Sequence, residues 1–115
     1  MNLENTKAQM RKGVLELCIL NMLQERDAYA NEIIEELKKA ELIVVEGTLY
    51  PLLTRLKNGG LLAYRWEEST SGPPRKYYSL TELGKSALKE LRLTWERLQE
   101  AVNHSMNETN ENKTS

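Results

Sequence analysis

Hydrophobic residues recur at helical spacing through most of the chain, and Gly, Pro and charged residues separate the runs. A period of three to four residues predicts an amphipathic helix, whereas alternation predicts a strand. The predicted order is helix, helix, short strand, helix, hairpin and long helix, at residues 7–24, 28–40, 42–45, 47–58, 61–80 and 81–103.

The first predicted helix carries apolar residues around most of its circumference. One stripe contains Met10, Val14, Leu17, Cys18 and Asn21, and a second contains Leu15, Ile19 and Met22. An apolar arc this wide requires cover on more than one side. Because a chain of this size has few other elements, we expect a partner chain to supply part of that cover.

The next two elements follow from local signals. Asp27 is suited to cap the start of the second helix, since its side chain can accept from free backbone N–H groups. The run Leu-Ile-Val-Val at residues 42–45 is too short for a helix and rich in branched residues, so it predicts a short strand.

The third predicted helix has one apolar and one polar face. Pro51 lacks an N–H and is harmless only near the first turn, which places the start near Gly47. Gly59 or Gly60 would end the helix in a left-handed conformation. The apolar face holds Leu49, Leu52, Leu53 and Leu56, and the polar face holds Thr48, Tyr50, Thr54, Arg55, Lys57 and Asn58.

The last two elements are a hairpin and a long helix. Residues 61–68 and 75–80 are the predicted strands, and residues 69–74 (Ser-Thr-Ser-Gly-Pro-Pro) are the predicted turn. The helix begins at Thr81, and its spacing of 3, 4, 3, 4 is that of a coiled-coil seam. Residues 104–115 are polar, so we expect a disordered tail. The seam consists of Leu88, Leu91, Trp95, Leu98 and Val102.

Composition narrows the class of protein. A chain of 115 residues suggests a single domain. Its one cysteine, Cys18, cannot form an internal disulfide. Without a signal-peptide pattern or a membrane-length apolar run, we expect a cytoplasmic protein. The net charge is −1, yet residues 47–78 carry five cations and two anions. That local excess is typical of either a nucleic-acid surface or a solvated charged surface.

Together these elements match a mainly α, α+β winged helix-turn-helix, with a three-helix core, a hairpin wing and a long C-terminal dimerisation helix. We assign residues 1–80 to a DNA-binding domain and residues 81–103 to the dimerisation helix, followed by the tail at 104–115. In this fold the third helix enters the major groove of DNA. Its leucines would face the core and its hydroxyls and cations the DNA. The predicted DNA-binding residues are Thr48, Tyr50, Pro51, Thr54, Arg55, Lys57, Arg75 and Lys76.

Three segments carry a resemblance to a known family. They are RKGVLELCILNMLQERDAYANEI, GTLYPLLTRLKNGGLL and GPPRKYYSLTELGK. They resemble the PadR family of bacterial transcription regulators over roughly residues 8–103. With a single C-terminal helix, the chain is similar to the short subfamily. The resemblance implies a homodimeric repressor of palindromic operator DNA, with the first and last helices forming the dimer interface.

The multidrug-sensing repressors of that subfamily carry a tryptophan on the last helix. For this chain we therefore expect a small aromatic effector, bound at the dimer interface, to release the DNA. This chain has Leu91 where such a relative has a small residue, and Gln99 where it has an acidic one. For Trp95 the alternatives are packing across the dimer and binding a ligand. By resemblance, the effector-binding positions are Met10, Leu17, Asn21, Leu91, Trp95, Gln99 and Val102.

Two other classes of function are weaker. A winged helix can use its polar face to bind a protein in place of DNA, and insensitivity of DNA binding to salt would favour that alternative. An enzyme is disfavoured, because the sequence has no nucleophile–base pair, phosphate loop or metal-ligand spacing. His104 has no neighbouring His or Cys with which to bind a metal. We expect no metal or cofactor and no membrane association.

Overall fold

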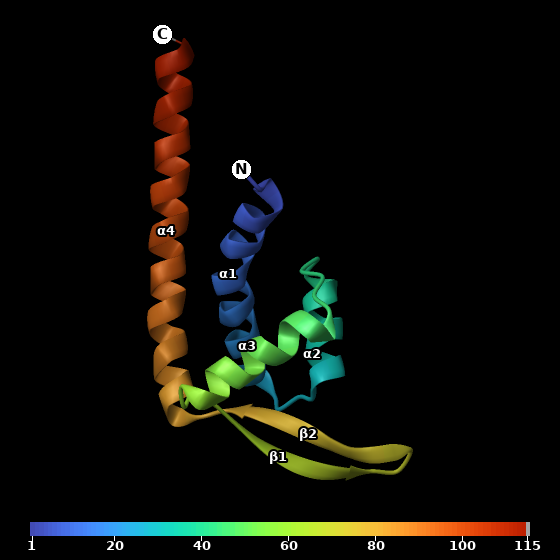
Figure 1. The fold of residues 1–115 in the computed structure, drawn as a ribbon. Helices are drawn as coiled ribbons and strands as arrows, with labels where there is room; N and C mark the ends of the chain where they lie inside the picture. The colour runs from blue at the N-terminus through green and yellow to red at the C-terminus, as the bar shows by residue number, and fades with distance from the viewer. Residues whose placement is uncertain (115) are drawn as a thin grey trace.

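The computed structural model describes residues 1–114, and the side chains of residues 1–108. It contains four helices and a two-stranded antiparallel hairpin, which confirms the predicted winged-helix fold (Figure 1). The elements are α1 Leu3–Glu25, α2 Ala30–Lys39, α3 Glu46–Asn58, β1 Leu62–Ser69, β2 Gly72–Leu80 and α4 Glu82–Thr114.

One apolar core joins the first three helices to the base of the hairpin. Helix α3 buries the four leucines of its predicted apolar face, and α1 and α2 bury side chains facing them. Leu88 is the residue of α4 that enters this core most completely. The fully enclosed side chains are Ile19, Leu20, Ile33, Leu49, Leu53 and Leu88.

Helices α1 and α4 lie side by side and run in opposite directions, and α4 extends well beyond α1 (Figure 1). Their facing surfaces are only partly covered within the chain. Met10 of α1 stays 73% exposed, and Leu98 of α4 stays 54% exposed. The wide apolar arc predicted for α1 is therefore buried on one side only. Its remaining apolar residues, Val14, Leu17, Cys18 and Met22, are half-buried.

The segment before and after α2 differs from the prediction. Asp27 does not cap α2; the helix begins after Tyr29, whose backbone N–H donates to Glu32 at 3.2 Å. Asp27 instead pairs with Arg65 of the hairpin. The Asp27 carboxylate, which the sequence predicted to cap α2, is thus used in an ion pair with Arg65.

Residues 42–45 do not form the predicted strand. After α2, Glu41 takes a positive φ of 63°, and the N–H of Leu42 donates to the carbonyl of Leu37 at 2.8 Å. This Schellman-type turn leads into an irregular connection in which Val44 is buried and Ile43 is exposed. The hairpin instead gains its extra bridge from Ala28, which exchanges two backbone hydrogen bonds with Tyr78.

The end of α3 follows the prediction. Gly60 has a φ of 83°, and its N–H donates to the carbonyl of Lys57 at 3.0 Å. The next N–H, of Leu61, reaches the carbonyl of Leu56, which completes a Schellman motif. This left-handed turn sends the chain directly into β1, which fixes the hairpin beside α3.

The second strand of the hairpin is longer than predicted, and the turn is shorter. Gly72, Pro73 and Pro74 belong to β2, so the turn is confined to residues 70–71. Because the described sheet has only two strands, each proline can lie at an open edge where its missing N–H breaks no ladder. The register pairs Tyr64 with Tyr78 and Trp66 with Lys76.

Helix α4 starts where predicted and continues further. The hydroxyl of Thr81 accepts from the N–H of Gly84 at 2.9 Å, capping the first turn. The helix was expected to end at Asn103, followed by disorder, but it continues to Thr114. Residues 104–114 contain no Gly or Pro to stop it, and His104 pairs with Glu108 one turn on at 3.1 Å. Ser115 lies outside the described residues.

Candidate nucleic-acid interface

Helix α3 turns its polar face away from the core. Thr48, Tyr50, Pro51, Thr54 and Lys57 are all exposed. At 100° per residue, Pro51 and Thr54 lie opposite the buried leucines, and Tyr50 and Lys57 lie on one flank. Thr48 lies on the other flank with Arg55, which is also exposed. All six predicted DNA-binding residues of α3 are therefore accessible.

The wing contributes the two further predicted cations, each held against aromatic rings. The guanidinium of Arg75 lies 4.5 Å from the ring centre of Tyr29. The ammonium of Lys76 lies 4.3 Å from the ring centre of Tyr64 and 5.3 Å from that of Trp66. Such cation–π contacts restrict a long side chain without neutralising its charge.

The rings beneath these cations are site components that sequence reasoning missed. Lys57 of α3 also lies over Tyr64, at 5.6 Å, so one ring links the helix to the wing. Alternation along β1 places Tyr64 and Trp66 on one face, and the register brings Lys76 onto that face. The alternation in β1 predicts that Tyr64 and Trp66 share a face, but only the strand register shows that Lys76 lies on that face too.

A hollow of about 300 Å³ separates the start of α2 from α3 and the wing. Tyr50 lines it from α3, and Arg75 and Lys76 line it from the wing. Glu46 contributes a carboxylate at the start of α3, and Trp66 contributes an exposed ring. The groove thus has cations on one wall and hydrogen-bonding groups on the other.

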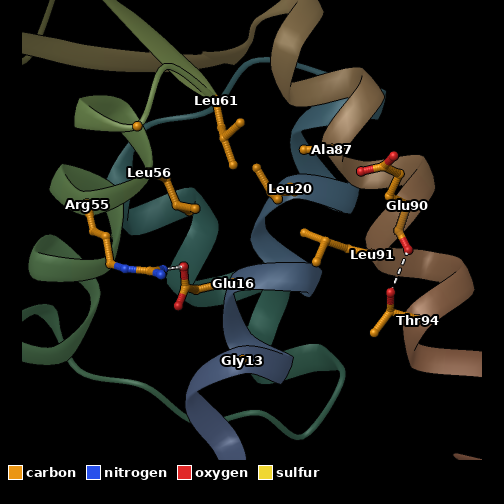
Figure 2. Close-up of a pocket in the computed structure, with 11 residues that line it drawn as sticks. Gly13, Glu16, Leu20, Arg55, Leu56, Leu61, Ala87, Glu90, Leu91 and Thr94 are labelled. Atoms are coloured by element: carbon orange, nitrogen blue, oxygen red, sulfur yellow. Dashed lines mark hydrogen bonds and ion pairs between the residues drawn. The ribbon is translucent and has the colours of Figure 1, made fainter. Parts of the chain in front are cut away.

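The remaining cations of residues 47–78 are engaged by carboxylates. Arg65 pairs with Asp27 and with Glu67, and these hydrogen bonds raise the pKa of its guanidinium. Arg55, the eighth predicted residue, lies on the flank of α3 that faces α1 and pairs with Glu16 (Figure 2). Among the described side chains, Lys57, Arg75 and Lys76 have no carboxylate partner within ion-pair distance.

Tyr78 anchors the base of the wing. Its side chain is buried, and its backbone forms both hydrogen bonds to Ala28. Removal from water raises the pKa of the Tyr78 hydroxyl, with smaller contributions from Tyr50 and Tyr64. Tyr77, its neighbour, stays half-buried with its ring against that of Tyr29. Successive residues of β2 thus place the ring of Tyr78 in the core and that of Tyr77 against the ring of Tyr29.

The residues predicted to bind an effector lie between α1 and α4. Met10, Leu17, Leu91 and Trp95 line one hollow of about 300 Å³. Leu17 and Trp95 also line a second, of about 370 Å³, together with Asn21 and Gln99. Val102 lines neither and is 48% exposed further along α4. Burial raises the pKa of the Cys18 thiol beside the second hollow.

Comparison with known proteins assigns the chain to a family. Residues 19–90 match the Transcriptional regulator PadR-like family. The transcriptional regulator Rv3488 of Mycobacterium tuberculosis is 31% identical over 94 residues, which are 82% of this chain and 87% of that protein. An uncharacterized protein of Lysinibacillus sphaericus is 30% identical over 99 residues, 84% of this chain and 91% of that protein.

Solved structures give the same result. A PadR-like transcription factor from Bacteroides fragilis is 64% identical, with 87% of this chain and 97% of that chain covered and a TM-score of 0.75. A PadR family transcriptional regulator from Eggerthella lenta is 33% identical, with 90% and 91% covered and a TM-score of 0.80. The chain belongs to the PadR-like family of transcriptional regulators, a family that is not enzymatic.

Within the described residues, no group of three His, Cys, Asp or Glu side chains could hold a metal ion. No described helix combines the length and apolar character needed to cross a membrane.

Proposed function

We propose that this regulator is a homodimeric repressor that binds palindromic operator DNA through α3 and the wing. The observation that carries the proposal is the grouping of Lys57, Arg75 and Lys76, three cations without carboxylate partners, beside the exposed face of α3. Cations of this kind attract phosphates, whereas Thr48, Tyr50 and Thr54 can reach base edges in the major groove.

The proposed dimer uses the open surfaces of α1 and α4. The seam residues Leu91, Trp95, Leu98 and Val102 are between 39% and 54% exposed in the single chain. Met106 extends that row by one more turn and is 61% exposed. A contiguous exposed apolar row is typical of a surface that another chain covers. A two-fold axis there would set two α3 helices about 34 Å apart, one turn of DNA.

The direct test of the DNA surface is Lys76→Ala. If Lys76 neutralises a phosphate in each protomer, its loss weakens binding to all duplex sequences. It also reduces the slope of log affinity against log salt by about 0.9 per protomer. Fluorescence anisotropy with a mixed-sequence duplex measures both quantities.

The matched control is Lys89→Ala, which removes one exposed cation from the side of α4 opposite the seam. It should leave the slope unchanged. An unaltered slope in Lys76→Ala would remove Lys76 from the contact surface. Weak DNA binding that does not respond to salt in the unmodified protein would favour the protein-binding alternative.

A second part of the proposal is that an aromatic effector binds at Trp95. The two hollows that share Leu17 and Trp95 support it, because each pairs apolar walls with an indole for stacking. Asn21 and Gln99 add hydrogen-bonding groups to one of them. A ligand with different affinities for two spacings of the protomers would change DNA affinity.

The test uses a Trp66→Phe background, so that Trp95 is the single remaining tryptophan. Planar aromatic dyes should quench its fluorescence and weaken DNA binding. Trp95→Ala should lose the effect of dyes on DNA binding while remaining dimeric. Dyes that neither quench Trp95 nor change DNA affinity would identify it as a packing residue.

A further inference from the structure

Arg55 and Glu16 form an ion pair between the proposed recognition helix and α1, across 39 positions of sequence. Figure 2 shows the guanidinium of Arg55 turned toward α1, with its ion pair to Glu16 drawn as a dashed line. The two side chains lie at the edge of a cavity of about 710 Å³ between α1, α3 and α4. Leu20, Leu56 and Leu91 form part of its apolar lining.

The two partners are unequally buried. The side chain of Glu16 is 13% exposed, whereas that of Arg55 is 62% exposed. A carboxylate largely removed from water needs a charged or hydrogen-bonding partner. Among the described residues, Arg55 is the charged partner within reach of Glu16. Arg55 itself is exposed enough to reach other anions.

A DNA phosphate would therefore compete with Glu16 for one guanidinium. Arginine stays charged and binds carboxylate and phosphate with the same fork of N–H groups. Leaving Glu16 for a phosphate would strand a partly buried carboxylate, which opposes the exchange. Lys57 lies on the other flank of α3, over the Tyr64 ring. No described carboxylate lies within ion-pair distance of its ammonium, so none competes there with a phosphate.

We infer that Glu16 is a positioning residue that holds the Arg55 guanidinium away from the DNA. The repressor therefore binds DNA less tightly than it would if Arg55 contacted a phosphate. This inference rests on the proposed DNA-binding function and specifies how α1 controls it. Glu16 touches no DNA and acts through Arg55. Glu16→Gln keeps the length of the side chain but removes its charge, which frees Arg55 for a phosphate.

The experiment measures affinity for a mixed-sequence duplex as a function of salt, with the full-length protein and four variants. Glu16→Gln should bind more tightly at low salt. Its log–log salt slope should steepen by about 0.9 per protomer, hence about 1.8 for a dimer on one duplex. Arg55→Gln alone should leave the slope unchanged, and adding Arg55→Gln to Glu16→Gln should abolish the gain.

Glu90→Gln is the matched control, since Glu90 lines the same cavity and its loss changes the net charge equally. It should leave the slope unchanged, which separates release of Arg55 from a general change in charge. Glu16→Met, apolar and of similar length, replaces Glu16→Gln if circular dichroism shows that Glu16→Gln does not fold.

The outcomes separate the two claims. Salt-dependent binding by the unmodified protein with no steepening in Glu16→Gln would overturn the inference and leave the proposed function standing. A slope reduced by Arg55→Gln alone would also overturn it, because Arg55 would already occupy a phosphate site. Absence of duplex binding by the unmodified protein and by every variant would contradict the proposed function itself, and the inference with it.

Discussion

Gly84 lets the first turn of α4 pack directly against Leu61 and Leu80, because it has no side chain. A Cβ at this position would lie 2.2 Å from the carbonyl oxygen of Leu61 and 2.7 Å from the side chain of Leu80. Real Cβ atoms do not approach a backbone oxygen so closely, and backbone at the base of a hairpin cannot move freely. Glycine is thus required by close approach and not by a special φ angle.

Gly84→Ala should therefore destabilise the protein by about 3 kcal/mol or more, at or above the usual cost of overpacking. Urea denaturation followed by circular dichroism measures the change. Gly72→Ala is the control, because a Cβ there meets nothing within 4 Å. Equal stability of the two variants would show that α4 can shift away from Leu61 without cost.

Tyr78 predicts how stability depends on alkaline pH. Burial raises the pKa of its hydroxyl in the folded protein above that of the unfolded chain. The folded state then holds the proton longer, so stability is intact below about pH 10, the ordinary tyrosine value, and declines above it. Tyr78→Phe should reduce this decline, measured as the urea midpoint at increasing pH.

Tyr50→Phe provides the comparison, since it removes a hydroxyl from a tyrosine that is 45% exposed. That variant should keep most of the alkaline decline of the unmodified protein, because Tyr50 contributes less than burial to the raised pKa of the Tyr78 hydroxyl. If Tyr78→Phe also keeps the full decline, ionisation of Tyr78 is not what destabilises the folded state.

At the level of elements, the seam of α4 predicts the oligomeric state. Leu91→Lys combined with Leu98→Lys places two charges on the proposed interface. Each leucine is worth roughly 1.5–3 kcal/mol when fully buried, so the double variant should be monomeric. Analytical ultracentrifugation measures the mass.

Leu93→Lys is the matched control, because Leu93 is 51% exposed and lies on the side of α4 opposite the seam. It should remain a dimer. A dimeric and well-folded double variant would place the interface elsewhere.

The elements differed in how well sequence could predict them. Periodicity located all four helices, because each repeats apolar residues at a helical spacing. The left-handed Gly60 was predictable because the preference is local. The strand at residues 42–45 was wrong because strand propensity depends on a pairing partner, and Ala28 holds that position beside Tyr78.

The predicted DNA surface likewise combines features that local spacing predicts with features that depend on contacts between residues far apart in sequence. The exposed face of α3 could be read from spacing alone. The pairing of Arg55 with Glu16 and of Arg65 with Asp27 could not, since it joins residues 39 and 38 positions apart in sequence. Counting cations therefore overestimated the free charge of residues 47–78, of which Lys57, Arg75 and Lys76 lack carboxylate partners among the described side chains.

On the scale of the whole molecule, the fold separates two tasks. Helices α2 and α3 and the hairpin lie at one end of the molecule, and α4 projects away from them (Figure 1). Lys57, Arg75 and Lys76 lie at that end, whereas α4 carries the exposed apolar row that begins at Leu91. Helix α1 belongs to both parts, since it packs against α2 and β2 on one side and against α4 on another. In the proposed dimer, any change in how two protomers meet along α1 and α4 would thus change the separation of their proposed DNA-binding surfaces.

In the proposed complex, two such surfaces related by a two-fold axis bind one duplex. Selection of tight-binding duplexes from a random-sequence pool by the full-length protein tests it most directly. A symmetric dimer should enrich a palindrome whose half-site centres are about 10 base pairs apart, which is one helical turn, or a whole multiple of that. Recovery of no common sequence, or of a single half-site without symmetry, would contradict it.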